Sequence, residues 1–302
     1  MTKRKKLIYV AGATATGKTT LSIQLAKAFK THIISCDSRQ FYKEMYIGTA
    51  VPNSDELNQV PHHFIQHRSI KKHYTLGDYE QHAFALLKEL FKKNNTVIMA
   101  GGSGMYADAV MNGLDVFPNV PKTIRQELEN TFQREGIEAL QKMVKEKDPL
   151  HYDHVDLQNP RRLIRALEIC LATGNPYSYY LNKSKENRPF TSIVLNLTWE
   201  RHRLYEKINQ RVDEMVRRGL EKEVERLHPM RHLNALNTVG YKEFFDYFEK
   251  KISYDKAIDE IKKNTRRYAK RQITWFRKYD KAITIMPNTS ITTIMQRLYD
   301  AY

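Results

Sequence analysis

Residues 12–19 read Gly12-Ala13-Thr14-Ala15-Thr16-Gly17-Lys18-Thr19, which is a complete phosphate-binding loop. The loop follows an apolar run at residues 7–11 and precedes an amphipathic stretch at residues 21–29. Glycines let the backbone wrap around an anion, N–H groups at a helix start point at it, and Lys18 neutralises charge. Strand, loop and helix signals occur in the required order, so we interpret the motif as a polyphosphate site and not as a chance glycine turn.

The composition limits the class of protein. With 302 residues, the chain can form one α/β domain plus an inserted or appended subdomain. Its 50 Lys and Arg residues exceed its 34 Asp and Glu residues, and the net charge of +16 predicts a polyanionic partner, with nucleic acid as the leading candidate. Cys36 and Cys170 form no CxxC motif, which argues against a disulfide framework or a zinc site.

The N-terminus predicts no secretion signal. Residues 1–6 are basic, but strand-like sequence follows them directly, and no apolar run is long enough to span a bilayer. We therefore expect a cytoplasmic protein that needs no membrane, and a monomer by default.

The apolar runs predict a P-loop-type, doubly wound parallel sheet. Three runs, at residues 7–11, 32–36 and 96–100, end in polar or glycine-rich loops. A helical pattern over residues 79–91 supplies a crossover between the second run and the third. Ligands of such sheets bind at the carboxyl ends of the strands, so we expect the loops after the three runs to form one composite rim.

The middle of the chain predicts an inserted helical subdomain at residues 116–189. The catalytic core would then comprise residues 1–115 and 190–302, and its C-terminal part would be helical. Helices are expected over residues 123–135, 137–147 and 159–172 in the insertion and, after a strand at 192–197, over residues 201–218, 220–227, 241–250 and 254–279.

Asp37 ends the second predicted strand and is the best candidate for a general base. A magnesium ligand and a helix cap are the alternatives, and local sequence does not choose among them. The third run ends in glycine and not in aspartate, which disfavours a phosphate-loop hydrolase. The Gly-Gly-Ser-Gly loop at residues 101–104 either presents N–H groups and the Ser103 hydroxyl to a phosphate or a bound base, or is only a tight turn.

A basic helix is predicted near the end of the chain. Residues 261–279 contain eight Lys or Arg residues and no acid, and the residues Ile261, Ala269, Ile273 and Phe276 form an apolar face that leaves the cations outward. Such a cationic face can follow a line of phosphates, whereas a merely solvated face usually carries both signs. A second basic cluster opens a helix in the insertion, so two basic surfaces could hold one folded RNA; its members are Arg161, Arg162 and Arg165.

The roles of two further pairs of residues have to be weighed. Arg211 and Arg217 lie in the same predicted helix, and helical position does not say which of them is an exposed, solubilising residue. His62 and His63 follow Pro61 in a predicted loop. No third ligand stands at a recognisable spacing, so we interpret both as loop-packing residues and not as metal ligands.

Together these segments resemble the tRNA dimethylallyltransferase family, also called tRNA isopentenyltransferases. Only the phosphate loop is common in other families, and the last segment is especially specific. Ala13, Ser103 and Met105 stand where the family usually has proline, threonine and leucine, and residues after Asp280 match nothing in the family. Besides the loop, the resemblance rests on residues 34–40, 47–50, 61–63, 101–106, 159–162, 165–168, 208–213, 239–243 and 266–277.

The resemblance implies transfer of a dimethylallyl group from dimethylallyl diphosphate to the exocyclic amine of the adenosine immediately 3′ of certain tRNA anticodons. Asp37 would accept a hydrogen bond or proton from the amine, while Ser103 and Arg211 would offset the charge on the departing pyrophosphate. Mg²⁺ is the implied cofactor, held by Thr19 through the phosphates. The implied diphosphate-binding residues are Gly12, Ala13, Thr14, Ala15, Thr16, Gly17, Lys18 and Thr19.

The implied partners are dimethylallyl diphosphate and the tRNA anticodon arm, with no protein partner. The target adenosine would be turned out of the anticodon loop into a channel. The residues expected to contact tRNA are Asp37, Ser38, Arg39, Gln40, Ser103, Gln158, Arg161, Arg162, Arg165, Lys263, Arg266, Arg267, Lys270 and Arg271.

Two alternative functions use the same phosphate cradle. One is prenyl transfer to free adenine nucleotides, and the other is a phosphate-loop kinase or ATPase. The basic helix at residues 261–279 argues against a free nucleotide as acceptor, because a mononucleotide needs no extended cationic surface.

Overall fold

The computed structural model describes residues 5–181 and 187–300. The chain forms two compact units, one from Met1–Met111 with Arg188–Tyr302 and the other from Asn112–Asn187. Within the described ranges, no helix is long and apolar enough to cross a membrane.

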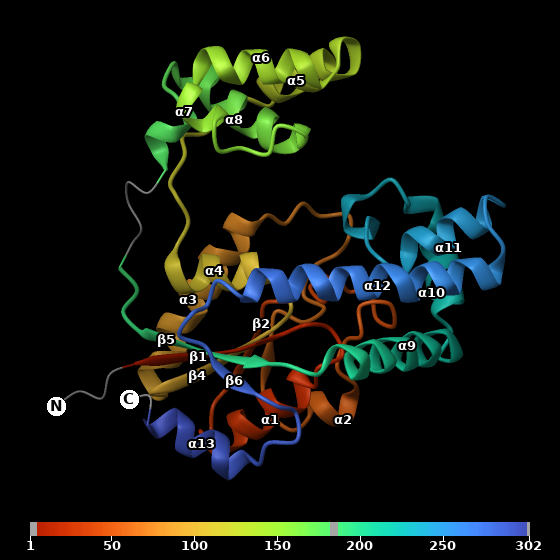
Figure 1. Cartoon of the computed structure of the whole chain (residues 1–302). Helices are drawn as coiled ribbons and strands as arrows, with labels where there is room; N and C mark the ends of the chain where they lie inside the picture. The colour runs from red at the N-terminus through yellow and green to blue at the C-terminus, as the bar shows by residue number, and fades with distance from the viewer. Residues whose placement is uncertain (1–4, 182–186, 301–302) are drawn as a thin grey trace. The chain divides into compact units, whose positions relative to one another are not determined.

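A six-stranded parallel sheet forms the centre of the first unit (Figure 1). The strand order is β3-β2-β4-β1-β5-β6, and every neighbouring pair is parallel. This topology confirms the predicted doubly wound parallel sheet. The strands are β1 (Lys6–Gly12), β2 (Ile33–Ser35), β3 (His62–His63), β4 (Thr96–Ala100), β5 (Thr191–Leu197) and β6 (Ile283–Ile285).

The edge strand β3 departs from the prediction. His62 and His63 do not lie in a loop but form β3, which pairs with Ile33 and Ile34 of β2. The His63 ring stacks on the His32 ring, with His32 Nδ1 2.9 Å from His63 Nε2. Across the described part of the chain no group of three or more His, Cys, Asp or Glu side chains could hold a metal ion. The histidines therefore lie at a sheet edge, and the described residues around them form no metal centre.

Helices cover both faces of the sheet (Figure 1). On one face lie α1 (Lys18–Ala28) and α13 (Ile291–Asp300), and on the other lie α3 (Leu76–Lys93) and α4 (Gly104–Asn112). Strand β1 alternates between these layers, because Leu7 and Tyr9 pack with α3 and α4 whereas Ile8 and Val10 pack with α1 and α13. Burying each large side chain of this kind contributes about 1.5–3 kcal/mol, so the central strand is firmly held.

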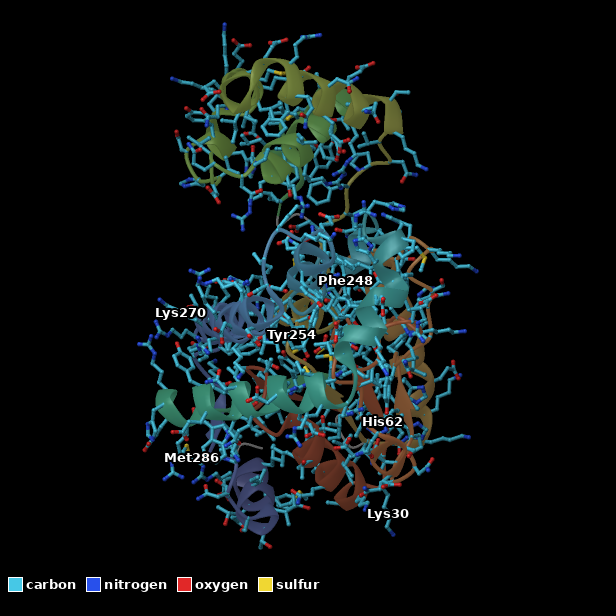
Figure 2. All side chains as sticks on the ribbon, turned by 90° about the vertical axis from the view of Figure 1, so that its right-hand side faces the viewer. Lys30, His62, Phe248, Tyr254, Lys270 and Met286 are labelled. Atoms are coloured by element: carbon cyan, nitrogen blue, oxygen red, sulfur yellow. The ribbon has the colours of Figure 1, made fainter. Side chains whose placement is uncertain are left out.

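The C-terminal helices have a core of their own. They are α9 (Arg201–Arg217), α10 (Leu220–Leu227), α11 (Tyr241–Phe248) and α12 (Tyr254–Phe276). Leu220, Tyr241, Phe244 and Ile261 are buried together at their contact, and Phe248 and Tyr254 pack beside them (Figure 2). From this core α12 extends over the loops that follow β1 and β4, which it contacts directly.

The second unit is a small helical bundle. Its helices are α5 (Lys122–Glu135), α6 (Ile137–Lys147), α7 (Pro149–Tyr152) and α8 (Pro160–Thr173), and they bury Leu128, Leu140, Val144, Leu163 and Leu167. In sequence this unit has eleven basic and eleven acidic residues. The net charge of +16 therefore resides entirely in the first unit.

Candidate active site

The phosphate loop leaves β1 and turns directly into α1. Gly12 and Gly17 have φ values of 149° and 90°, and a Cβ on Gly12 would lie 2.8 Å from Thr16 Oγ1 and 2.9 Å from Leu197 O. Glycine is required there for lack of space as well as for conformation. Thr16 Oγ1 donates to Ala13 O at 2.8 Å. The loop is thus held as a preformed cradle, with the N-terminus of α1 at its base.

Two partly buried cations give this cradle its electrostatic character. Lys18 Nζ donates to the carbonyls of Gly12 and Ala13, at 3.0 and 2.7 Å. Burial lowers the pKa of Lys18 to about 8; the Asp37 charge raises it and the Arg211 charge lowers it. Burial also lowers the pKa of Arg211, an effect that Asp37 opposes. The cavity around the cradle is lined by two carboxylates, Asp37 and Glu56, and by five cations, Lys18, Arg39, Arg211, Lys242 and Arg271. This excess of positive charge favours binding of an anion.

The Asp37–Gln40 loop is held by hydrogen bonds within itself and to two other segments of the same protein. Asp37 Oδ1 accepts the N–H of Arg39 at 3.1 Å. The Arg39 guanidinium donates to Ala235 O at 2.9 Å, and Gln40 Nε2 donates to Ala50 O at 2.9 Å. Arg39 and Gln40 therefore support the loop from two sides. Their expected contacts with tRNA stay predictions.

The loops after β2 and β4 are in direct contact. A Cβ on Gly101 would lie 2.7 Å from the backbone nitrogen of Asp37. Ser103 Oγ accepts the Ser38 N–H at 3.1 Å and lies 3.1 Å from Ser38 Oγ. The structure thus brings Ser103 to the Asp37 loop, as expected for a composite rim.

The glycines of the loop after β4 make room for α12. A Cβ on Gly102 would overlap the amide group of Gln272, and one on Gly104 would overlap the Trp275 indole. Gln272 is only 5% exposed, whereas Ile273 is 38% exposed. The predicted apolar face is therefore wrong at Ile273, because the helix turns Gln272 inward to meet backbone groups of both glycine loops.

A cavity of about 630 Å³ joins these elements. Arg211 lines it, whereas Arg217 forms a solvent-exposed ion pair with Glu214 at 2.7 Å. The structure thus distinguishes the two arginines, which helical position alone did not. Tyr268 also lines the cavity, and burial raises its pKa to about 12, with the Asp37 charge adding to this effect. The walls include residues 14–20, 37–40, 48–50, 237–240, Lys242, Thr265, Arg271 and Gln272.

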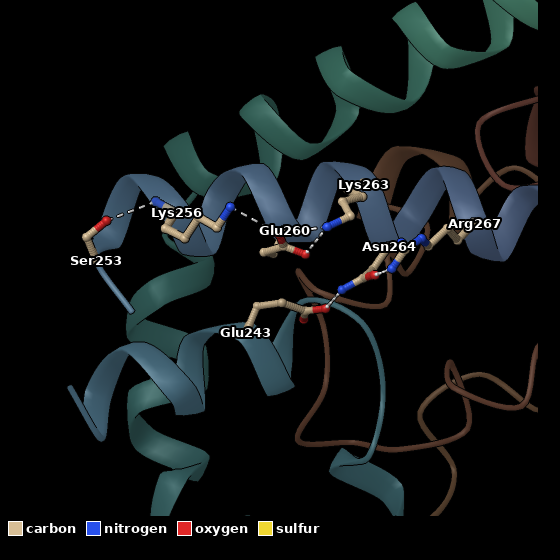
Figure 3. A network of polar contacts seen from close by, with 7 residues as sticks. All are labelled: Glu243, Ser253, Lys256, Glu260, Lys263, Asn264 and Arg267. Carbon is tan, nitrogen blue, oxygen red and sulfur yellow. Dashed lines mark hydrogen bonds and ion pairs between the residues drawn. The ribbon is translucent and has the colours of Figure 1, made fainter. Parts of the chain in front are cut away.

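Several cations of α12 are engaged within the first unit (Figure 3). Lys263 Nζ lies 3.0 Å from Glu260 Oε1, and Arg267 donates to Asn264 Oδ1 at 3.3 Å. The prediction that this face leaves the cations outward holds only in part, because acids on α4, α9 and α12 itself pair with some of them. The other engaged cations are Lys262 with Asp213, Arg266 with Asn209, and Lys278 with Asp108.

Lys270 and Arg271 lie on the exposed side of α12, and Lys270 is labelled in Figure 2. Arg271 also lines the cavity. Arg271 therefore reaches both the cavity and the exposed side of α12, and Lys270 lies next to it on that exposed side.

The predicted tRNA contacts of the second unit lie at the start of α8. Arg161 and Arg162 are exposed in its first turn, and Gln158 is exposed just before it. Arg165 instead pairs with the buried carboxylate of Glu168 at 3.2 Å, and its guanidinium lies 5.2 Å from the centroid of the Phe117 ring. Within this unit, Arg165 thus has a structural role in addition to any contact with RNA.

Glu223 is a site-supporting residue that sequence reasoning missed. Its buried carboxylate accepts the N–H groups of Tyr46, Ile47 and Gly48 at 3.1, 2.7 and 3.0 Å, and the Tyr241 hydroxyl at 2.6 Å. These bonds hold the loop that supplies residues 48–50 of the cavity wall. Nothing in the polar pattern of α10 distinguishes Glu223 from its exposed neighbours.

Comparison with known proteins decides the family. A family model described as IPP transferase matches residues 40–279. The chain belongs to the tRNA dimethylallyltransferase (IPP transferase) family. It is 52% identical to a tRNA dimethylallyltransferase of Flavobacterium psychrophilum over 283 residues, which are 92% of each chain. The predictions of this family and of a transferase enzyme are confirmed.

Solved structures of the IPP transferase family agree with the fold. The full-length tRNA isopentenylpyrophosphate transferase of Bacillus halodurans is 33% identical, with a TM-score of 0.72 over 99% of this chain and 95% of that one. A eukaryotic dimethylallyltransferase acting on tRNA is 25% identical, with a TM-score of 0.82 over 94% of this chain and 74% of that one. The architecture described above is therefore that of the family.

Proposed function

We propose that this cavity transfers a dimethylallyl group from dimethylallyl diphosphate to the exocyclic amine of the adenosine immediately 3′ of a tRNA anticodon, with release of pyrophosphate. One observation carries the assignment: the phosphate cradle, Asp37 and Arg211 line a single cavity. A cradle for a departing diphosphate beside a carboxylate suits attack of an amine on the carbon that bears the diphosphate.

The residues divide into a donor side and an acceptor side. Lys18 and Arg211 offset the negative charge that develops on pyrophosphate as the bond to carbon breaks. Asp37 accepts a hydrogen bond or the proton of the attacking amine. Ser103, hydrogen-bonded to Ser38, supports the acceptor side through the Asp37 loop.

Mg²⁺ fits the donor side. The Thr19 hydroxyl and the Glu56 carboxylate line the cavity, and oxygen ligands of this kind suit Mg²⁺. The described residues form no complete metal cluster of their own, so the diphosphate would supply the remaining ligands. When bound there, Mg²⁺ would neutralise charge on the diphosphate, with Thr19 helping to hold it.

The positive charge of the first unit supports a polynucleotide acceptor. All of the net charge lies in this unit, and Arg271 of the basic helix α12 lines the cavity itself. An adenosine stacked in an anticodon loop must leave the stack to enter a recessed site, and Lys270 and Arg271 would hold the neighbouring phosphates. Arg161, Arg162 and Gln158 would contact the anticodon arm from the second unit.

A competition assay tests this function against its two alternatives. Purified protein is incubated with labelled dimethylallyl diphosphate, Mg²⁺ and equal concentrations of unmodified tRNA and AMP. We expect label in tRNA only. Label in AMP would instead favour the free-nucleotide transferase, and phosphate release from ATP without any isoprenoid would favour a kinase or ATPase.

A further inference from the structure

We propose that Gln272 is a positioning residue that fixes the donor side of the cavity relative to the acceptor side. Its side chain bonds two loops at once: Oε1 accepts the Thr14 N–H at 2.9 Å, and Nε2 donates to Gly102 O at 2.9 Å. Thr14 belongs to the phosphate cradle, and Gly102 belongs to the loop that carries Ser103. This inference rests on the proposed function for its meaning in the reaction.

The two partners dictate the chemistry of position 272. The Thr14 N–H can only donate and the Gly102 carbonyl can only accept, so the side chain between them must do both. A carboxylate can accept but not donate, and an ammonium can donate but not accept. Because Gln272 is 5% exposed, a lost partner would leave a buried polar group unsatisfied.

The surrounding helix holds Gln272 in place. One turn along α12, Trp275 packs where Gly104 leaves room, and its Nε1 donates to Asp108 Oδ2 at 3.2 Å. Tyr279 donates to the other oxygen of Asp108 at 2.7 Å. These contacts anchor the end of α12 to α4, so the Gln272 amide is presented to both loops from a rigid element.

The position of Gln272 matters because the two loops hold opposite partners of the reaction. The cradle holds the diphosphate, while Ser103 reaches the Asp37 loop through Ser38. A small displacement of reacting groups lowers the rate of a transfer reaction steeply. Gln272 therefore acts on the transfer step through the two loops and not on the affinity for RNA.

The test compares Gln272→Met, which keeps the size but removes both bonds, with Gln272→Glu, which keeps only the acceptor. Gln296→Met is the matched control, because Gln296 is exposed on α13 and bonds only Asp300 among the described residues. Four quantities are measured: kcat and KM for prenyl transfer, the Kd of Mg²⁺-pyrophosphate by calorimetry, the Kd of tRNA by filter binding, and Tm. For both Gln272 variants we expect kcat to fall about 10- to 100-fold, with tRNA affinity within about 2-fold of the original.

We expect Gln272→Met also to weaken pyrophosphate binding by about 10-fold, since the Thr14 N–H loses its partner. The control should match the original protein in all four quantities. Unchanged kcat and pyrophosphate affinity in Gln272→Met would overturn the proposal. A loss of tRNA affinity as large as the loss of kcat would also overturn it. If the original protein transfers no prenyl group, the proposed function fails, whereas the pyrophosphate titration still decides the role of Gln272.

Discussion

Pyrophosphate binding should depend on the protonation of Lys18, and the size of the effect follows from its environment. Burial lowers the pKa of Lys18 to about 8. About nine-tenths of the side chains are then charged at pH 7 and about one-tenth at pH 9. Because an anion requires the charged form, the affinity for pyrophosphate should fall about 10-fold over this interval from Lys18 alone.

The control for this experiment is Lys18→Arg, because arginine stays charged throughout. Pyrophosphate itself ionises in this range, and that effect is common to both proteins. The ratio of the two dissociation constants, measured by calorimetry between pH 7 and pH 9, therefore isolates Lys18. If the ratio of the two dissociation constants does not change between pH 7 and pH 9, the proposed role of the Lys18 charge is refuted.

Two variants check the directions in which the neighbouring charges shift the pKa of Lys18. The Arg211 charge lowers the pKa of Lys18, so Arg211→Gln should move the midpoint of the pH dependence upward. The Asp37 charge raises this pKa, so Asp37→Asn should move the midpoint downward. Shifts in the opposite directions would contradict the electrostatic arrangement described above.

Three further changes probe other parts of the site. Asp37→Asn should lower kcat about 10²- to 10⁴-fold while tRNA affinity stays within about 2-fold, as measured by single-turnover prenyl transfer and filter binding. Replacing Lys270 and Arg271 by alanine should weaken tRNA binding and reduce the slope of log Kd against log salt by about 0.7–0.9 for each lost phosphate contact. Glu223→Ala should lower the free energy of unfolding by about 3–5 kcal/mol, because it leaves three partly buried N–H groups and the buried Tyr241 hydroxyl without their partner. Tyr241→Phe should lower it by about 1–3 kcal/mol, and urea unfolding measures both.

The salt-slope experiment has a control variant, and the other two experiments have results that would contradict them. Lys93→Ala removes an exposed cation at the end of α3, which precedes the amino end of β4, and should leave the salt slope unchanged. A large loss of tRNA affinity in Asp37→Asn would make Asp37 an anchoring residue and not a base. A Glu223→Ala protein as stable as the original would show that the 46–48 loop does not depend on this carboxylate.

The centre of the fold was predictable because its signals are local. Strands β1, β2, β4 and β5 are apolar runs, and the glycines and the lysine of residues 12–19 define the phosphate loop by spacing alone. Strand β3 escaped prediction because it has two polar residues, His62 and His63, whose pairing depends on a distant strand. Strand β6 and α13 lie in a segment without a recognised motif, and only their packing on the sheet reveals them.

The site was predictable only in part, because side-chain direction depends on tertiary contacts. Hydrophobicity favoured Ile273 for the inner face of α12, although Ala269, Gln272 and Phe276 have the helical spacing of buried positions. The Thr14 N–H and the Gly102 carbonyl, which lie in two loops far away along the chain, bond Gln272 and place it on the inner face instead. No pattern in the sequence of α12 indicates these partners. Helical position alone did not choose between Arg211 and Arg217, and only the family resemblance pointed to Arg211. Glu223 was missed altogether, because its partners lie in a loop far away along the chain.

The central claim is that the cradle and Asp37 act together on a base of tRNA, and one measurement tests it most directly. A purified, unmodified tRNA is incubated with the protein, dimethylallyl diphosphate and Mg²⁺, then digested and analysed by mass spectrometry at the level of single nucleotides. We predict one added five-carbon unit, on the adenosine immediately 3′ of the anticodon, and addition of the same unit at a rate about 10²- to 10⁴-fold lower with Asp37→Asn. Unchanged nucleotides across suitable tRNAs, or an added group at another position, would contradict it.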